Sequence, residues 1–130
     1  MDINEDGSFS EVIPVKGIVN TVHDEKFPHL SLDGKFLFFS SKGYENVGGF
    51  DVFKTRRTKK GYVTIVNLGN TINSEEDEIA FIPATEKIGY ITSNREGGQG
   101  RCDIYKITEY VKPQQVSGIV LDFQTTPPRF

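Results

Sequence analysis

One stretch of the sequence occurs twice, and this internal repeat limits the architectures open to the chain. The first copy covers Phe27 to Phe53 and the second covers Ala80 to Tyr105. Matched residues are 53 positions apart at the start of the stretch, as with Asn20 and Asn73, Asp24 and Asp77, and Glu25 and Glu78. They are 52 positions apart later on, as with Ser41 and Ser93, Asp51 and Asp103, and Lys54 and Lys106. The chain therefore contains two related structural units, and the second is shorter by one residue.

The residue types within the repeat predict strands. Ten Phe and five Tyr favour extended backbone, and thirteen Gly supply turns. No window shows a helical period with caps. We expect short strands at residues 9–15, 27–31, 35–40, 50–55, 62–68, 79–82, 88–92 and 103–108.

Glycines mark the turns between these strands. Asp33-Gly34 predicts a tight turn that requires a positive φ at Gly34, and we expect the same of Gly49 and of the glycines at 97–100. The second copy departs from the first, because residues 83–87 replace the Asp-Gly turn. Its first hairpin is therefore less clearly specified.

Four short strands repeated at about 50 residues are typical of a β-propeller blade. We therefore expect an all-β fold of two four-stranded, antiparallel blades, a partial propeller within residues 1–111. Blade 1 should cover about 9–68 and blade 2 about 69–108, although the second copy offers no outer strand of its own. The sheets should pack face to face through six apolar residues or their strand neighbours: Phe36, Phe38, Phe39, Val52, Tyr90 and Ile104.

Two blades cannot close a ring, since propellers need about four to eight. The chain is therefore either part of a larger propeller or a protomer that assembles. Each end should leave an unpaired strand edge, which favours edge-to-edge association. The expected strand at 9–15 is a candidate to pair with 103–108 of a neighbour.

Composition excludes several classes of function. A net charge of -3 gives no electrostatic basis for binding nucleic acid. No apolar run approaches the ~20 residues of a membrane-spanning helix. The acidic start of the chain shows no secretory signal, and the single Cys102 rules out an intrachain disulfide.

Four acidic residues are the candidate contacts with a ligand. Asp24, Glu25, Asp77 and Glu78 lie at matched places before a strand, where carboxylates could line a central channel and bind a cation or a basic group. The alternative, which we favour, is that they accept backbone N–H bonds and hold the loops. We assign a structural role in turns or blades to five further residues: Asp33, Gly34, Gly49, Asp51 and Asp103.

No catalytic, cofactor-binding or metal-binding group is predicted. His23 and His29 lack the further ligands of a zinc site, and Cys102 has no partner His in a recognisable pattern. Ser40-Ser41 lacks the glycines of a nucleophile elbow. The glycine pairs lack the strand–glycine–helix context of a phosphate loop. We therefore expect a protein that is not an enzyme.

Several motifs resemble a known family. Residues 28–41, Pro-His-Leu-Ser-Leu-Asp-Gly-Lys followed by Leu-Phe-Phe-Ser-Ser, resemble the TolB-like, WD-type propeller repeat. Gly48 to Phe53, residues 67–78 and the ending at 93–105 are similar to repeats in OmpA-family envelope proteins of Bacteroidetes-type bacteria. Residues 112–130 resemble a linker and the first strand of a carboxypeptidase-regulatory-like sandwich domain, which would be truncated here.

The resemblance implies a non-catalytic scaffold or interaction module of a periplasmic, outer-membrane-associated protein, with type IX secretion as one setting. Partners would be envelope proteins or a glycan, and peptidoglycan would be bound by a domain that these residues do not contain. An accessory propeller of a hydrolase or peptidase, or a glycan-binding module, is the alternative. An OmpA-like or an α/β-hydrolase domain beside the propeller would distinguish the two.

Overall fold

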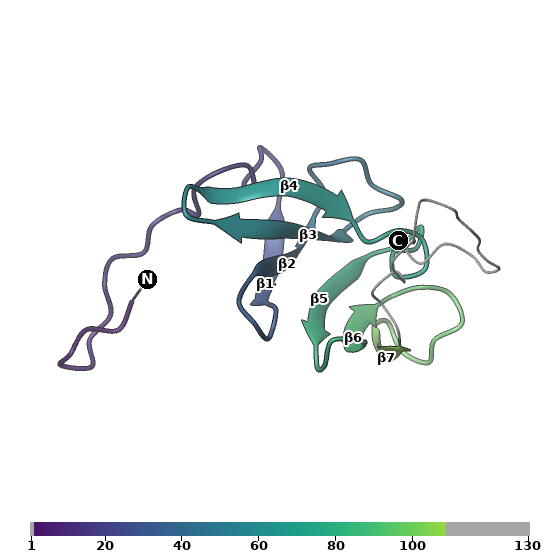
Figure 1. Cartoon of the computed structure of the whole chain (residues 1–130). Coiled ribbons are helices and arrows are strands. Elements are labelled where there is room, and N and C mark those ends of the chain that lie inside the picture. Colours follow the sequence, from purple (N-terminus) through teal and green to yellow (C-terminus); the bar gives the residue numbers. More distant parts are fainter. Residues whose placement is uncertain (1, 109–130) are drawn as a thin grey trace, which may run out of the picture.

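The computed structural model describes residues 2–108, and within them it contains seven strands and no helix (Figure 1). The first sheet has the order β1-β2-β3-β4 and the second the order β5-β6-β7, with every neighbouring pair antiparallel. The strands are β1 Glu25–Leu30, β2 Phe36–Ser41, β3 Asp51–Thr58, β4 Gly61–Asn67, β5 Glu78–Pro83, β6 Ile88–Ser93 and β7 Asp103–Thr108. The prediction of an all-β fold built from antiparallel hairpins is confirmed.

The expected strand at 9–15 is wrong. Phe9 forms only an isolated bridge with Ile3 across the turn at Gly7, whose φ is +86°. This first segment projects away from both sheets (Figure 1). A strand needs a neighbour to satisfy its backbone, and no strand of residues 2–108 lies beside this segment. The first sheet therefore has the expected four strands, whereas the second has three.

The repeat extends to an irregularity of the backbone. The pairing of β1 with β2 shifts register between Lys26 and His29, and that of β5 with β6 shifts between Ile79 and Ile82. Each shift contains a non-glycine residue with positive φ, Phe27 at 53° and Ala80 at 56°. Residues 27 and 80 are again 53 apart, so both units contain the same β-bulge.

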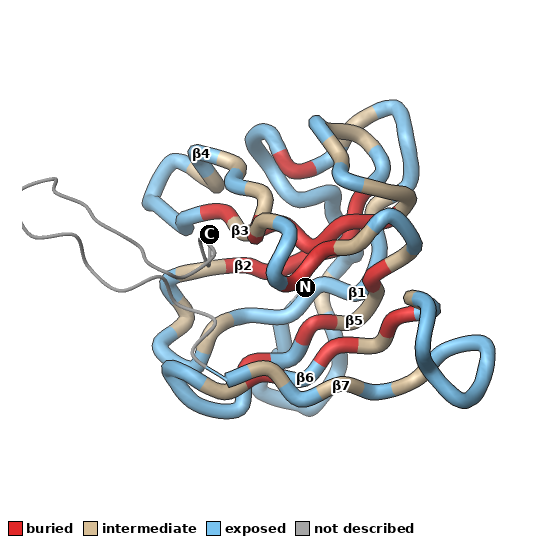
Figure 2. The backbone as a smooth tube through the Cα atoms, turned by 90° about the vertical axis from the view of Figure 1, so that its right-hand side faces the viewer, coloured by how far each residue is buried: buried red, intermediate tan, exposed pale blue. Residues whose placement is uncertain are grey.

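The main apolar cluster lies between the two sheets. It consists of six buried residues, namely Phe38, Val52, Leu68, Ile72, Phe81 and Ile91. The rings of Phe38 and Phe81 lie 4.9 Å apart and join β2 to β5. Buried positions run along β2, β3, β5 and β6 where the sheets face each other (Figure 2).

A second apolar cluster covers the opposite face of the first sheet. Val19, Leu37, Phe39 and Phe53 are buried there, and the Tyr44 ring lies 5.2 Å from that of Phe53. Strand β2 is therefore buried on both faces. The run of apolar residues at 36–39 predicts this double burial.

Three of the six named inter-sheet residues do not lie between the sheets, but a strand neighbour of each does, as the prediction allowed. Phe39 belongs to the second cluster, and Tyr90 and Ile104 are 39% and 75% exposed. Their strand neighbours Ile91 and Tyr105 face the first sheet instead. Apolar residues stand next to each other on β6 and β7, so the alternation of side chains does not reveal which face is covered.

Residues 109–130 lie outside the described part, and so does the predicted linker and sandwich strand at 112–130. Within residues 2–108, no helix has the length and apolar character needed to cross a membrane.

Candidate functional site

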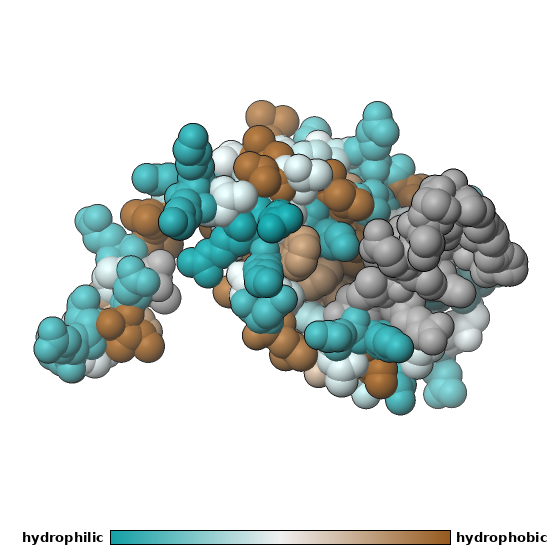
Figure 3. Space-filling model, in the orientation of Figure 1, coloured by the Kyte–Doolittle hydropathy of each residue, from teal (hydrophilic) through white to brown (hydrophobic). Residues whose placement is uncertain are grey.

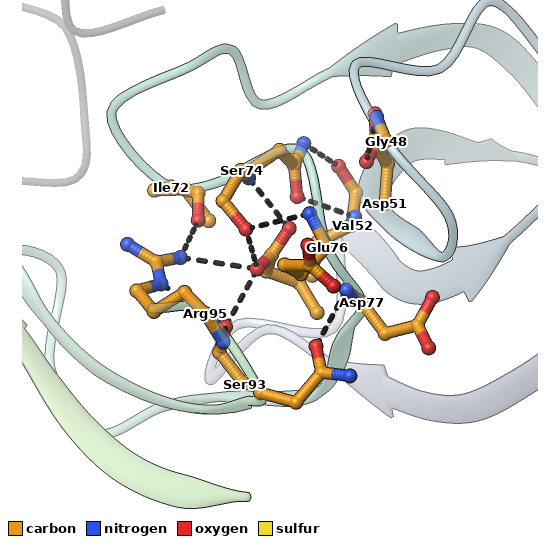
Figure 4. Close-up of polar contacts among 12 residues, drawn as sticks. Gly48, Asp51, Val52, Ile72, Ser74, Glu76, Asp77, Ser93 and Arg95 are labelled. Carbon is orange, nitrogen blue, oxygen red and sulfur yellow. Dashed lines mark hydrogen bonds and ion pairs between the residues drawn. The ribbon is translucent and has the colours of Figure 1, made fainter. Parts of the chain in front are cut away.

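The matched acidic residues lie at the starts of the first strand of each sheet, and Glu78 is the most enclosed. Its side chain is fully buried at the start of β5. It accepts hydrogen bonds from the Ser74 N–H at 2.6 Å, the Ser74 hydroxyl at 2.6 Å and the Ser93 hydroxyl at 2.7 Å. Arg95 adds an ion pair at 3.3 Å, so the donors converge from the loop before β5, with Ser74, and from the end of β6, with Ser93 and Arg95 (Figure 4). A buried carboxylate needs such donors.

Glu25 has the same arrangement at the start of β1. It accepts hydrogen bonds from the Thr21 N–H at 2.9 Å, the Thr21 hydroxyl at 2.6 Å and the Ser41 hydroxyl at 2.8 Å. Burial acts to raise the pKa of Glu25, but the bonds from Thr21 and Ser41 outweigh it, and the pKa lies below its ordinary value of 4.5. In both units the glutamate ties the loop before the first strand to the end of the second strand.

The two aspartates of these pairs differ. Asp77 accepts a 2.8 Å hydrogen bond from the Phe50 N–H, which joins the second unit to the first. The side chain of Asp24 is exposed. Of the four candidate contacts, Asp24 is therefore the one whose side chain is open to solvent.

Asn73 is the central polar residue between the sheets, and sequence reasoning did not select it as a site residue. Its side-chain oxygen accepts a 2.7 Å bond from the Val52 N–H, and its amide donates to the Val52 carbonyl at 3.0 Å. It also donates to the Asn67 side chain at 2.9 Å. An amide side chain that pairs with both backbone groups of one residue replaces a neighbouring strand. Its match to Asn20 was the signal available in the sequence.

The loop before β3 approaches the second unit closely. The Gly49 N–H donates to the Glu76 carbonyl at 3.0 Å, and the Glu78 N–H donates to the Phe50 carbonyl at 2.7 Å. A Cβ on Gly49 would lie 2.0 Å from a carboxylate oxygen of Asp77, and one on Gly48 would lie 2.3 Å from the backbone of Glu75. The prediction of a positive φ at Gly49 is wrong, because the residues with positive φ do not include it. Glycine is needed there for close packing.

Asp51 and Asp103 hold the turns that precede β3 and β7. Asp51 accepts from the Val47 N–H at 2.5 Å, the Gly48 N–H at 3.3 Å and the Asn67 amide at 2.8 Å. Burial raises the pKa of Asp51 above its ordinary value despite these bonds. Asp103 accepts from the N–H groups of Gln99 at 2.7 Å and Gly100 at 3.1 Å.

The turn at Asp33-Gly34 has the predicted form. Gly34 has φ +72°, and its N–H donates to the Ser31 carbonyl at 2.9 Å. The Asp33 carboxylate accepts from the Ser31 hydroxyl at 2.7 Å and the Lys35 N–H at 2.9 Å. In the second copy Thr85 closes the hairpin instead, through bonds from the N–H groups of Lys87 and Ile88 to its hydroxyl.

The remaining reactive side chains differ in their exposure to solvent. His23, His29 and Cys102 are exposed, whereas Ser40 and Ser41 are buried in β2. Within residues 2–108, no three His, Cys, Asp or Glu side chains are grouped so that they could hold a metal ion. What the matched polar residues do is join loops to strands and one unit to the next.

Comparison with family models, curated proteins and solved structures gives no match for this chain.

Proposed function

We propose that the chain is a non-catalytic interaction module made of two β-propeller-type blades, in an OmpA-family envelope protein associated with the outer membrane. The observation that carries the proposal is the joining of two matched units. Glu25 and Glu78 fix matched loops, and Asn73 pairs with the backbone of Val52 across the sheets. A stack of repeats held in this way is a rigid support for surface loops.

The binding surface in this proposal consists of loops that differ between the copies. The hairpin between β3 and β4 has four exposed basic residues at or near its turn, which are Arg56, Arg57, Lys59 and Lys60. The corresponding hairpin of the second sheet is absent from residues 2–108, because that sheet ends at β7. A concentrated positive charge at one end of a rigid sheet suits an acidic protein surface or an acidic glycan.

The compartment follows from the resemblance of residues 28–41 and 48–53 to envelope repeats. The module would lie in the periplasm, with type IX secretion as one setting, and another domain of the full-length protein would bind peptidoglycan. An accessory role beside a hydrolase or peptidase remains the competing hypothesis.

The test is affinity capture from envelope extract with the chain as bait. The expected result is specific retention of an envelope protein or glycan that is lost when Arg56, Arg57, Lys59 and Lys60 are replaced by Glu. Asp24→Ala tests the exposed acidic contact. Asp77→Ala is unsuitable, because it also removes the bond to the Phe50 N–H.

A panel of hydrolase substrates is the counter-test. Turnover that persists through purification and disappears on replacing one Ser, His or Asp would overturn the non-catalytic proposal. Retention unaffected by the basic substitutions would remove the hairpin from the binding surface.

A further inference from the structure

The internal interface joins one surface of each unit, and each unit also has a counterpart of the surface that the other unit uses. Each sheet has a back face, which carries Phe38 and Val52 in the first sheet and their counterparts Tyr90 and Ile104 in the second. Each unit also has a front face, formed in the second unit by Ile72, Asn73, Phe81 and Ile91. The internal interface joins the back face of the first sheet to the front face of the second unit.

The second back face lacks a cover within residues 2–108. Val52 is 0% exposed and Phe38 is 4% exposed, whereas Ile104 and Tyr90 are 75% and 39% exposed. The matched residues have the same strand position and similar apolar character, so burial is the difference between them. The back face of the second sheet is therefore an unpartnered copy of a surface that is packed elsewhere in the same molecule.

The first front face is open only in part, because Val19 and Phe39, the counterparts of Ile72 and Ile91, are already buried in the second apolar cluster. The open part contains Asn20 and Pro28. Asn73 is buried, and its side-chain amide bonds to both the N–H and the carbonyl of Val52. Its counterpart Asn20 is exposed and makes a long 3.4 Å bond to the Val15 carbonyl. Phe81 is buried, whereas Pro28 at the same position is exposed. Asn20 thus has an amide available for the backbone of another unit.

The strand edges are complementary as well. Strand β4 covers the edge of β3, with Ile65 opposite Thr55. In the second sheet β7 pairs with β6 alone among the described strands. The segment matched to β4 is the projecting segment 9–15, whose Phe9, Val12 and Ile13 are 62%, 83% and 60% exposed. The same projecting segment carries hydrophobic side chains in the space-filling view (Figure 3).

We propose that the back face and β7 edge of the second sheet bind segment 9–15 and the exposed front-face residues Asn20 and Pro28 of a second copy of this chain. Segment 9–15 adds to β7 as an outer strand, with Val12 opposite Ile107 as Ile65 lies opposite Thr55. The Asn20 amide pairs with the backbone of Ile104, as Asn73 pairs with Val52. The Asp24 side chain lies beside the Cys102 backbone, as Asp77 lies beside Phe50.

This contact joins different surfaces of the two copies, so it is head-to-tail and leaves one free surface at each end of a dimer. Besides Pro28 in place of Phe81, a further position differs from the internal interface. Arg101 occupies the place of Gly49, where a side chain would meet the counterpart of Asp77. Asp24 must therefore turn aside, and it then lies next to a guanidinium of opposite charge.

The first experiment compares association of the whole chain with that of two variants by light scattering. Ile104→Asp should reduce the measured mass to that of one chain, while the urea midpoint of the single chain stays unchanged because Ile104 is exposed. Leu32→Asp is the matched control, since Leu32 is also exposed but lies at the β1–β2 turn. It should associate as the unchanged chain does. A monomeric unchanged chain at its highest soluble concentration, or equal association of Ile104→Asp, would overturn the proposal.

The second experiment tests the head-to-tail geometry with two single-cysteine chains. One is the unchanged chain with Cys102, and the other carries Asp24→Cys with Cys102→Ser. A short bismaleimide should give a covalent dimer when the two are mixed and little when either is alone. Cross-linking of either chain alone, at a yield equal to the mixture, would show a symmetric contact and overturn the proposal. So would a mixture that fails to cross-link although it associates.

Discussion

Two glycines in the first unit, Gly34 in the β1–β2 turn and Gly49 in the β2–β3 loop, are required for different reasons, and this can be measured. Gly34 has φ +72° and no neighbouring atom within 4 Å of an added Cβ, so Gly34→Ala should cost about 1–2 kcal/mol from backbone strain alone. Gly49→Ala should cost about 1–3 kcal/mol by displacing the Asp77 carboxylate from the Phe50 N–H. Urea unfolding gives both values.

The double variants separate the two causes. In an Asp77→Ala background the cost of Gly49→Ala should fall by at least half, because the clashing carboxylate is gone, whereas the cost of Gly34→Ala should be unchanged. Additive costs at Gly49 and Asp77 would contradict the close-packing explanation.

The lowered pKa of Glu25 makes a prediction about acid stability. A carboxyl group whose pKa is lower in the folded chain stabilises the fold above its unfolded pKa. This contribution disappears as the pH falls from about 4.5 through the folded pKa. Glu25→Gln should therefore be less stable than the unchanged chain at pH 7, by about 1–3 kcal/mol from a lost acceptor. It should also lose less stability between neutral and acidic pH.

Urea midpoints measured from pH 7 down to pH 3 test this expectation. Asp51 titrates in both proteins, so the difference between them reports Glu25. Glu86→Gln removes a carboxylate at an exposed position in the turn between β5 and β6, and it should have the urea midpoint of the unchanged chain at pH 7. Parallel curves for Glu25→Gln and the unchanged chain would show that the Thr21 and Ser41 bonds do not favour the ionised form.

At the scale of the strand, the repeated bulge is a source of strain. Ala80 holds φ 56° within β5, a conformation that costs an L-residue about 1–2 kcal/mol. Ala80→Gly should be neutral or stabilising by up to about 1 kcal/mol, because relief of strain offsets the greater freedom of the unfolded chain. Ala84→Gly, just beyond the strand and at an ordinary φ, should cost about 0.5–1 kcal/mol. Thermal or urea unfolding should show that Ala80→Gly is more stable than Ala84→Gly. The reverse order of stability would contradict a left-handed backbone at Ala80.

At the scale of the whole molecule, Asn73 couples the two sheets. Asn73→Ala leaves the buried Val52 N–H without its partner and should cost about 1–3 kcal/mol. Asn20→Ala at the matched but exposed position should change the stability of the single chain by less than about 0.5 kcal/mol. In hydrogen exchange, Asn73→Ala should lose more protection than Asn20→Ala, and the loss should appear on both sides of the interface, in β3 and in β5. Equal effects of the two substitutions would mean that Asn73 does not join the sheets.

The sequence alone determined the features that depend on neighbours close along the chain. The Gly34 turn and the turns held by Asp51 and Asp103 follow from backbone geometry and hydrogen bonds within a few residues. The double burial of β2 follows from its uninterrupted apolar run. The internal repeat also predicted two related antiparallel units, because equal sequences form equal local structures.

Tertiary structure decided what depends on a second surface. Whether Tyr90 or Ile91 faces inward depends on which side another sheet covers. Segment 9–15 has the composition of a strand, but a strand forms only beside a partner. Gly49 is glycine because Asp77 approaches it, and Asn73 differs from Asn20 because Val52 lies against only one of them. Matched residues have the same local preferences, so only the presence of a neighbouring unit makes their burial and their contribution to stability different.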